Sequence, residues 1–472
     1  MRSVLRCVAT AAAFVAAWAV APVAARAEPP GEAAFGAMLK EMVETDTSVA
    51  TGDCTALATK IAARMTAAGF PAGDLHVFVP DGAPKAGNLV AVLPGRDPKA
   101  RAVLMLGHID VVNARREDWV RDPFTLIEEG GQLFGRGVSD MKAQDAIWAD
   151  TLVRYRNEGY RPARAVKMAL TCGEEGGFEN GAEWLARNQR ELIDAGIALT
   201  EGGGGALDAD GHRLAVTVMA AEKVFSNYVL EVTGPGGHSS LPRPENPIVT
   251  LGQALANLKY LSFPTELNDN SRAYFNALGP RVDAETGAAM RRVLADAADP
   301  AANAILNRSV AYHAMLRTTC IPTLVEGGHA VNAQPQRARA TINCRSLPGS
   351  PLAAVEAAIV AAVNDPRVKV TGAPAGPARA PAPPLTPNVM GPIIQVAAVV
   401  FPGVPVTRMQ ETFGTDAGRL IAVGIPTYGF SALFRGDDAG NIHGLNEHIA
   451  VQSVLDGREF MYRLIKAYAE QK

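Results

Sequence analysis

Histidine and carboxylate residues stand at the ends of several apolar runs in this sequence. His108 and Asp110 follow the apolar run 102–106 and lie two positions apart. Residues i and i+2 of an extended chain share a side, so Asp110 can orient a metal-bound His108 by accepting the second N–H of its imidazole. Taken alone, such a pair is more often an ordinary buried histidine with a hydrogen-bond partner.

Two adjacent carboxylates, Glu174 and Glu175, follow the apolar run 166–171. At the end of a buried strand such neighbours repel each other, and one stays protonated unless cations neutralise the pair. Beside two metal ions, one glutamate can bind metal while the other accepts a proton from water. Two solvated loop carboxylates are the simpler alternative.

Three further segments offer ligands of the same chemical type. Asp140 follows a glycine-rich turn at the start of a predicted helix that ends near Glu158, and an aspartate there is by itself best explained as the helix N-cap. Glu201 ends the apolar run 197–200 and precedes four glycines, and His443 lies in a polar turn far along the chain. Each segment alone is ambiguous.

Together these segments contain the ligands for two metal ions. Imidazole and carboxylate groups are the ligands of catalytic zinc, and one carboxylate can bridge two zinc ions about 3.5–4 Å apart. The chain has only eight histidines, so two of them beside carboxylates are informative. The sequence therefore predicts two Zn2+ per chain, with Co2+ or Mn2+ as substitutes, held by five histidine and carboxylate side chains.

The elements that must position these side chains alternate between strands and helices. The runs 88–93, 102–106, 166–171 and 197–200 are nearly all apolar, as strands buried on both faces are. Helical patterns lie between them, for example from 55 to 69. This alternation predicts an α/β fold with a mostly parallel sheet flanked by helices.

Near Glu222 the pattern changes to half-exposed, alternating strands such as 225–233, and a run rich in Pro, Gly and Ala later ends this segment. Elements of the first kind then resume, with helices at 389–400 and 451–469. The sequence thus predicts five parts: a signal peptide (1–27), a first catalytic part (28–221), an inserted α+β lid or dimerisation domain (222–371), a linker (372–387) and a second catalytic part (388–472).

Composition restricts the class of partner. The chain has 472 residues, 48% of them hydrophobic and 20% charged, with a formal net charge of -3. Its length suits two or three domains. No basic surface that would bind nucleic acid or an anionic membrane is indicated, so a small molecule or peptide is the expected substrate.

The N-terminus has the pattern of a secretory signal peptide. Two arginines, Arg2 and Arg6, lie ahead of an apolar run. The small-residue segment 25–27 predicts cleavage after Ala27. A secreted or periplasmic protein without stable membrane association is expected. A membrane anchor is the alternative, but the run 8–23 is short for a membrane span and contains Pro22.

Four cysteines remain after that cleavage, at positions 54, 172, 320 and 344. An oxidising compartment permits disulfides. Cys320 and Cys344 lie in strand-like runs separated by a Gly-Gly turn, so a cross-strand disulfide and two buried free thiols both fit the sequence.

The order of these motifs resembles the co-catalytic dizinc peptidase and deacylase family, which includes glutamate carboxypeptidase, aminoacylase, acetylornithine deacetylase and succinyl-diaminopimelate desuccinylase. The resemblance covers nearly the whole mature chain. The roles that it implies are as follows: His108 and Glu201 hold one zinc, Glu175 and His443 hold the other, Asp140 bridges both, Asp110 orients His108, and Glu174 is the general base and acid.

The predicted insert also resembles this family. The segment around His238 is similar to a lid motif whose histidine stabilises the oxyanion in the partner subunit's active site, which implies a homodimer. Asn332 and Arg345 resemble lid residues that hold a substrate carboxylate or oxyanion. Gly414 and Thr415 resemble a substrate-side loop whose backbone N–H groups could bind a carboxylate. From the residues alone, a turn histidine, a loop asparagine and a solvated strand arginine are the alternatives.

Glu201 bears on the substrate. By the resemblance, glutamate here is typical of carboxypeptidases and acyl-amino-acid hydrolases, whereas dipeptidases and aminopeptidases tend to have aspartate. The expected reaction is hydrolysis of a peptide or N-acyl amino acid with a free carboxylate. Ala143 and Asn113 depart from the family pattern at positions that supply no ligand. A dipeptidase or aminopeptidase of the same family and a catalytically silent periplasmic binding protein are the alternatives.

Overall fold

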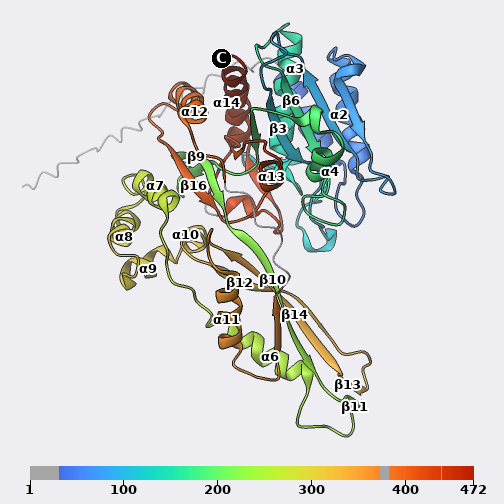
Figure 1. Cartoon of the computed structure of the whole chain (residues 1–472), viewed down its shortest axis with the longest axis vertical. Coiled ribbons are helices and arrows are strands. Elements are labelled where there is room, and N and C mark those ends of the chain that lie inside the picture. Colours follow the sequence, from blue (N-terminus) through green and yellow to red (C-terminus); the bar gives the residue numbers. More distant parts are fainter. Residues whose placement is uncertain (1–30, 373–381, 437, 472) are drawn as a thin grey trace, which may run out of the picture.

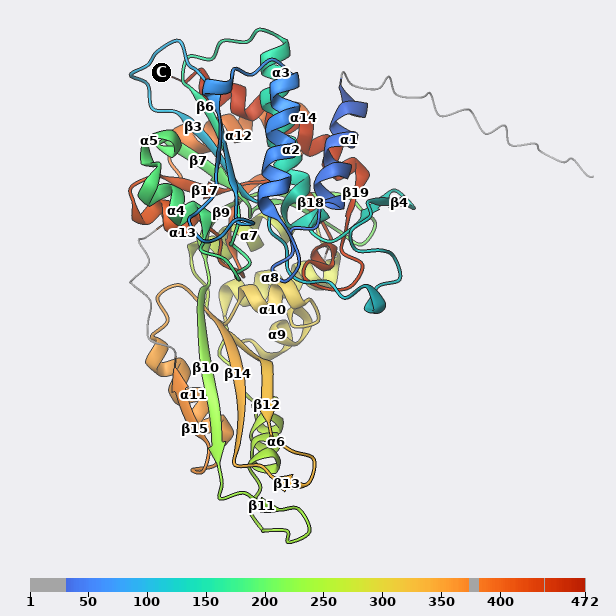
Figure 2. The same cartoon turned by 90° about the vertical axis from the view of Figure 1, so that its right-hand side faces the viewer.

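The computed structural model describes residues 31–372, 382–436 and 438–471. The predicted signal peptide (1–27) and residues 373–381 of the predicted linker lie outside the described residues. An α/β body carries both ends of the described chain, and an elongated arm of strands and helices extends from it (Figures 1 and 2). Every helix within the described ranges is too short or too polar to cross a lipid bilayer.

A ten-stranded sheet forms the centre of the α/β body, in the order β1-β2-β6-β3-β7-β17-β9-β8-β18 with β16 attached to β9. Neighbours from β6 to β17 are parallel, as are β9 and β16. The predicted α/β fold with a mostly parallel sheet is confirmed. The strands are β1 (Leu75–Phe78), β2 (Asn88–Leu93), β3 (Val103–His108), β6 (Val166–Thr171), β7 (Ile197–Thr200), β8 (Gly204–Leu207), β9 (Arg213–Glu222), β16 (Val406–Glu411), β17 (Thr427–Gly429) and β18 (Phe434–Arg435).

Helices cover both faces of this sheet, which explains why its central strands are apolar throughout. The first layer contributes to one large core, and the second packs against the opposite face. The first layer consists of α1 (Glu32–Glu44), α2 (Cys54–Ala67), α3 (Ala143–Asn157), α12 (Pro387–Val400) and α14 (Val451–Ala469), and the second of α4 (Gly181–Asn188), α5 (Arg190–Ile193) and α13 (Ala417–Ala422). A small antiparallel sheet at the edge consists of β4 (Ile127–Glu129), β5 (Gln132–Phe134) and β19 (His448–Ala450).

The arm is a four-stranded antiparallel sheet in the order β12-β14-β10-β15, with two helices on one face. A short strand pair, β11 with β13, lies at its far tip (Figure 1). The elements are β10 (Val224–Thr233), β11 (Gly237–His238), α6 (Pro247–Leu258), β12 (Thr319–Gly327), β13 (Ala333–Gln334), β14 (Arg337–Ser346), α11 (Leu352–Val363) and β15 (Lys369–Gly372).

Four helices between α6 and β12 pack on the α/β body. They share a hydrophobic cluster with Leu214 and Ala215 of β9, and this cluster is separate from the core of the arm. The helices are α7 (Asp269–Leu278), α8 (Ala284–Ala295), α9 (Pro300–Leu306) and α10 (Val310–Met315). The segment 222–371 therefore contributes to two cores, and the root of the arm is fixed to the main sheet.

Two disulfides are present among the described residues. Cys320 and Cys344 face each other on the antiparallel strands β12 and β14, which decides between the two alternatives that the sequence left open. Cys54 and Cys172 form a second disulfide between the first turn of α2 and the residue after β6. No motif or spacing links these two cysteines in the sequence, where 118 positions separate them.

Candidate metal centre

Three neighbouring parallel strands bring the predicted ligands together. Strands β6, β3 and β7 are adjacent in the sheet and run in the same direction. Their carboxyl ends therefore meet at one edge, which is where α/β sheets place their ligands. His108 is the last residue of β3, the Glu174–Glu175 pair follows β6, and Glu201 follows β7.

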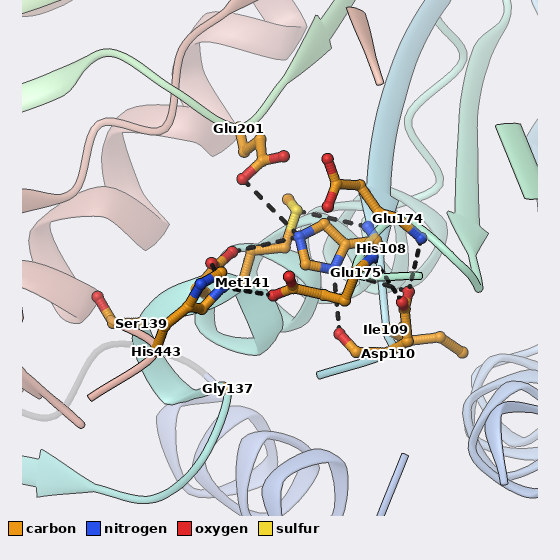
Figure 3. Close-up of polar contacts among 12 residues, drawn as sticks. His108, Ile109, Asp110, Gly137, Ser139, Met141, Glu174, Glu175, Glu201 and His443 are labelled. Atoms are coloured by element: carbon orange, nitrogen blue, oxygen red, sulfur yellow. Dashed lines mark hydrogen bonds and ion pairs between the residues drawn. The ribbon is translucent and has the colours of Figure 1, made fainter. Parts of the chain in front are cut away.

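Asp140 lies between the two histidines. Its Oδ1 is 3.2 Å from His108 Nε2, and its Oδ2 is 3.2 Å from His443 Nε2 (Figure 3). Glu201 Oε2 is 3.8 Å from His108 Nε2, and Glu175 Oε1 is 2.8 Å from His443 Nε2. The five predicted ligands thus form two groups of three, and Asp140 belongs to both.

The environment of Asp140 differs from that of an N-cap. Helix α3 begins only at Ala143 and has no side-chain cap. Asp140 lies in the turn Val138–Lys142, directly before the helix, where its φ of -128° and ψ of 93° are non-helical. The N-cap interpretation, which the isolated motif favours, is therefore wrong, and the carboxylate points at the histidines instead.

Asp110 contacts both His108 and the glutamate turn. Its backbone carbonyl accepts a hydrogen bond from His108 Nδ1 at 3.0 Å, whereas its carboxylate Oδ1 is 3.8 Å from that nitrogen. The carboxylate accepts hydrogen bonds from the backbone N–H groups of Glu174 and Glu175, at 3.3 and 2.9 Å. Asp110 thus orients the imidazole mainly through its main chain and holds the glutamate turn through its side chain.

The electrostatics of the centre favour bound cations. Burial, together with the charge of Glu201, raises the pKa of Glu174 to about 10, and burial raises that of Glu201 to about 7. Burial lowers the pKa of His443, but hydrogen bonds to Asp140 and Glu175 outweigh this effect and raise it to about 10. Protons thus supply positive charge where the ligand atoms converge. Two divalent cations would supply it more completely, so this donor set fits a pair of metal ions.

Glu174 occupies a distinct place beside the ligand groups. It belongs to neither group of three. In Figure 3 its carboxylate extends toward that of Glu201, on the side of His108 away from the Asp110 carboxylate. A carboxylate beside the metal ligands is suited to accept a proton from water there.

A buried ion pair, Arg136 with Glu447, joins the Asp140 and His443 loops. Arg136 Nη1 is 2.7 Å from Glu447 Oε2, and Arg136 Nη2 donates to the Gly444 carbonyl at 2.9 Å. Glu447 also accepts hydrogen bonds from three backbone N–H groups, those of Gly137, Ser139 and Asp140, at 2.9, 2.8 and 3.0 Å. The sequence pattern alone assigns no role to Glu447. Its position four residues after His443 was the available signal.

A second arginine supports the same loop from the opposite side. Arg435, in β18, donates to Ser139 through Nε to Oγ at 2.9 Å and through Nη2 to the backbone carbonyl at 2.8 Å. Because Ser139 directly precedes Asp140, Arg435 and Glu447 together fix the loop that carries the shared ligand. No motif in the sequence pointed to Arg435.

The predicted lid residues lie at opposite ends of the arm. His238 and Asn332 are exposed at the tip, where the Asn332 carbonyl accepts a hydrogen bond from Ser239 N at 3.1 Å. Arg345 pairs with Phe225 near the root of β14, and its guanidinium carbon lies 4.8 Å from the centre of the Phe225 ring. The structure therefore does not bring His238 or Asn332 to the metal centre of the same chain (Figure 1).

The loop before α13 lies close to the root of the arm. The Thr415 hydroxyl donates to Glu222 at the end of β9 and accepts a hydrogen bond from Ala417 N at 3.0 Å. Its neighbour Asp416 is buried and accepts a hydrogen bond from Asn180 Nδ2 at 2.6 Å. Gly414 is half-buried in this loop. The loop thus contacts both the root of the arm and the N-terminus of α4, the helix that follows the glutamate turn.

Known proteins resemble this chain in sequence and in fold. The family model described as peptidase family M20/M25/M40 matches residues 104–467. The N-fatty-acyl-amino acid synthase/hydrolase PM20D1 of Mus musculus is 27% identical over 393 residues, which cover 79% of this chain and 75% of that protein. The metallo-carboxypeptidase Sso-CP2 of Sulfolobus solfataricus aligns with a TM-score of 0.66 at 17% identity, over 92% of this chain and 99% of that one. Human carnosine dipeptidase 1 aligns with a TM-score of 0.69 at 16% identity, over 93% and 96% of the two chains.

The role of Glu447 can be tested with Glu447→Gln. An amide group would turn N–H donors toward backbone N–H groups or Arg136, so the Asp140 loop should lose its fixed position. We expect zinc affinity to fall about 10- to 100-fold, which is the usual effect of replacing a residue that orients a metal ligand through hydrogen bonds. The measurement is calorimetric titration of the metal-free protein with Zn2+.

Glu459→Gln is the control for this prediction. Glu459 lies on α14 and pairs with Arg463 at the surface, so its substitution should leave zinc binding unchanged. Equal zinc affinities for the two variants would show that Glu447 does not position the ligand loop.

Proposed function

Because the chain belongs to peptidase family M20/M25/M40, and is therefore a hydrolase of amide bonds, we propose that it cleaves N-acyl amino acids or peptides that have a free carboxylate. In this proposal the active site holds two zinc ions, one at His108 and Glu201 and the other at Glu175 and His443, bridged by Asp140. The observation that carries it is the pair of ligand groups that share Asp140, with Glu174 beside them.

When bound, two zinc ions lower the pKa of water and polarise a carbonyl oxygen. In the proposed reaction Glu174 accepts the proton of the attacking water and then donates it to the leaving amine nitrogen. Glu174 must be ionised when it accepts the proton, and bound cations would favour that form; burial favours the protonated carboxyl that exists between the two steps. Asp110 keeps Glu174 in place through the hydrogen bond to its backbone N–H.

The arm suggests how a second subunit takes part. Phe225, which pairs with Arg345, and Thr233, at the end of β10, are eight positions apart, so the root and the tip lie roughly 26 Å apart at about 3.3 Å per residue. The amide oxygen and the carboxylate of an N-acyl amino acid are only a few bonds apart, so one substrate cannot have them bound at opposite ends of the same arm. We therefore assign Arg345 to the active site of its own chain, and His238 and Asn332 to that of the partner in a homodimer.

The substrate class rests on two supports. The relative from Mus musculus is named for N-fatty-acyl amino acids, in which an amide bond lies next to a free carboxylate. Arg345 and the Gly414–Thr415 loop, at the root of the arm, would bind that carboxylate. A dipeptidase is the second candidate, because human carnosine dipeptidase 1 has the same fold.

Export is part of the proposal. The N-terminal pattern predicts a signal peptide that is removed after Ala27. The two disulfides among the described residues suit an oxidising compartment such as the periplasm.

The first experiment combines metal analysis with a substrate panel. Purified protein is expected to contain two zinc ions per chain, to lose activity on chelation and to regain it with zinc. In the panel, N-acyl amino acids of increasing acyl length should be hydrolysed faster than free-amine dipeptides. Faster hydrolysis of the dipeptides would support the second candidate, and metal-loaded protein without activity on either class would support the alternative of a binding protein.

Glu174→Gln tests the proton transfer step. The amide keeps the size of the side chain but cannot accept the proton, so kcat should fall by at least about 100-fold. The zinc content should stay at two per chain, because Glu174 is not a ligand in the proposal. Activity within tenfold of the parent chain would rule out the assigned role.

The contribution of His238 to the partner's site can be tested by mixing two inactive variants. Glu174→Gln chains retain His238, and His238→Ala chains retain Glu174. A mixed dimer contains one complete site, so random subunit exchange should restore about a quarter of the parent activity. If His238 acted within its own chain, the mixture would stay as inactive as its components.

A further inference from the structure

The disulfide between Cys54 and Cys172 lies next to the catalytic turn. Cys172 is two residues before Glu174 and three before Glu175, and both cysteine side chains are completely buried. Cys54 is the first residue of α2. The disulfide thus connects the start of the glutamate turn to the N-terminal part of the chain, which contributes no ligand.

The segment that precedes Cys54 contacts two of the loops that carry proposed ligands. The Thr47 hydroxyl donates to the Ile109 carbonyl at 2.6 Å, and the Thr47 carbonyl accepts from Val111 N at 3.2 Å. Lys142 Nζ, two residues after Asp140, donates to the Thr45 carbonyl at 3.0 Å. We refer to residues 45–54 as the brace, because they contact the loops that carry His108 and Asp140.

The brace also packs directly against the glutamate turn. A Cβ atom at Gly177 would lie 2.1 Å from Val49 Cγ1, so only glycine allows this close approach. Gly173, Gly176 and Gly177 all have positive φ, and the turn therefore has little regular structure of its own. Apart from the disulfide, hydrogen bonds to Asp110 and Asn88 hold the turn at its beginning.

Electrostatic repulsion acts on the turn in the opposite direction. Glu175 shares a ligand group with Asp140, and the Glu174 carboxylate extends toward that of Glu201 (Figure 3). Before cations bind, carboxylates that converge in this way repel one another wherever they are ionised, and this repulsion acts against the position of the turn that metal binding requires. A covalent link can resist this force at a point where the other restraints are single hydrogen bonds.

We propose that the Cys54–Cys172 disulfide is a positioning element of the metal centre, which holds Glu175 and Glu174 in place before the metal ions bind. The inference rests on the proposed function for the roles of these two glutamates. It predicts that the oxidised protein binds zinc more tightly at one of its two sites than the protein without this disulfide. Catalytic turnover should decrease with the loss of the disulfide, because Glu174 is in the same turn.

The chain contains a matched control for this proposal. Cys320–Cys344 joins two strands of the arm, and its cysteines contact none of the five ligands. Removing either disulfide should lower the melting temperature, because each one constrains the unfolded chain. Only the removal of Cys54–Cys172 should change zinc binding.

The experiment compares Cys54→Ala/Cys172→Ala with Cys320→Ala/Cys344→Ala in the full chain. Metal-free protein is titrated with Zn2+ by calorimetry below the melting temperature of both variants, and kcat and KM are measured with an N-acyl amino acid. We expect at least about tenfold weaker binding at one zinc site in the first variant, a similar loss in kcat and little change in KM. The second variant should bind zinc within twofold of the parent chain. Zinc binding within twofold of the parent in the first variant would overturn the proposal.

A second measurement applies if Cys54→Ala/Cys172→Ala does not fold. In the Cys320→Ala/Cys344→Ala chain, a phosphine reduces the remaining disulfide to two thiols and is itself oxidised to the phosphine oxide with oxygen from water. Thiol counting confirms the reduction, and the zinc titration follows after removal of the reagent and again after reoxidation by air. Weaker binding that recovers on reoxidation supports the proposal, and unchanged binding overturns it. Because these titrations need no substrate, an error in the proposed substrate class would affect only the kinetic measurements.

Discussion

Carboxylates that repel one another converge at the carboxyl ends of β3, β6 and β7, and the rest of the structure depends on how that charge is balanced. Asp140 contacts both His108 and His443, while Glu201 and Glu175 each approach one of them. The pKa of Asp140 is held well below its usual range because hydrogen bonds from the two histidines outweigh its burial. A carboxylate shared between two imidazoles is an arrangement suited to two cations, and it restricts where the nearby loops can lie.

The scaffold keeps these groups together by binding the loops to one another. Glu447 and Arg136 join the loops of Asp140 and His443, and Asp110 joins the end of β3 to the glutamate turn. In both cases a buried carboxylate accepts hydrogen bonds from main-chain N–H groups, so its negative charge is stabilised and the carboxylate holds two loops together. The positions of the ligands therefore depend on contacts between segments that are more than 300 residues apart, as Arg136 and Glu447 are.

The parts of the fold and site that could be predicted from sequence are those encoded locally. The apolar runs that became β2, β6 and β7 have the predicted bounds, whereas β3 begins one residue later than predicted, at Val103, and extends two residues further, to His108. The role of Asp140 was harder to predict, because a short motif cannot distinguish an N-cap from a ligand when the partner histidine is far away in sequence. The Cys54–Cys172 pairing and the hydrogen bonds of Arg435 depend entirely on tertiary structure, so no periodicity or spacing could indicate them.

The attachment and the length of the arm bear on the proposed dimer. Helices α7 to α10 fix the root of the arm to β9, and the antiparallel strands β10 and β14 continue without interruption toward the tip. Lys223, between β9 and β10, strengthens the attachment of the arm. Its Nζ donates hydrogen bonds to the backbone carbonyls of Ala314 and Arg317, at 3.0 and 2.8 Å. A rigid strand pair that holds Arg345 at its root cannot bend its tip back over the metal centre of the same chain. In the proposed dimer, the length of the arm becomes functional, because it allows His238 to reach the site of a second subunit while Arg345 remains beside its own.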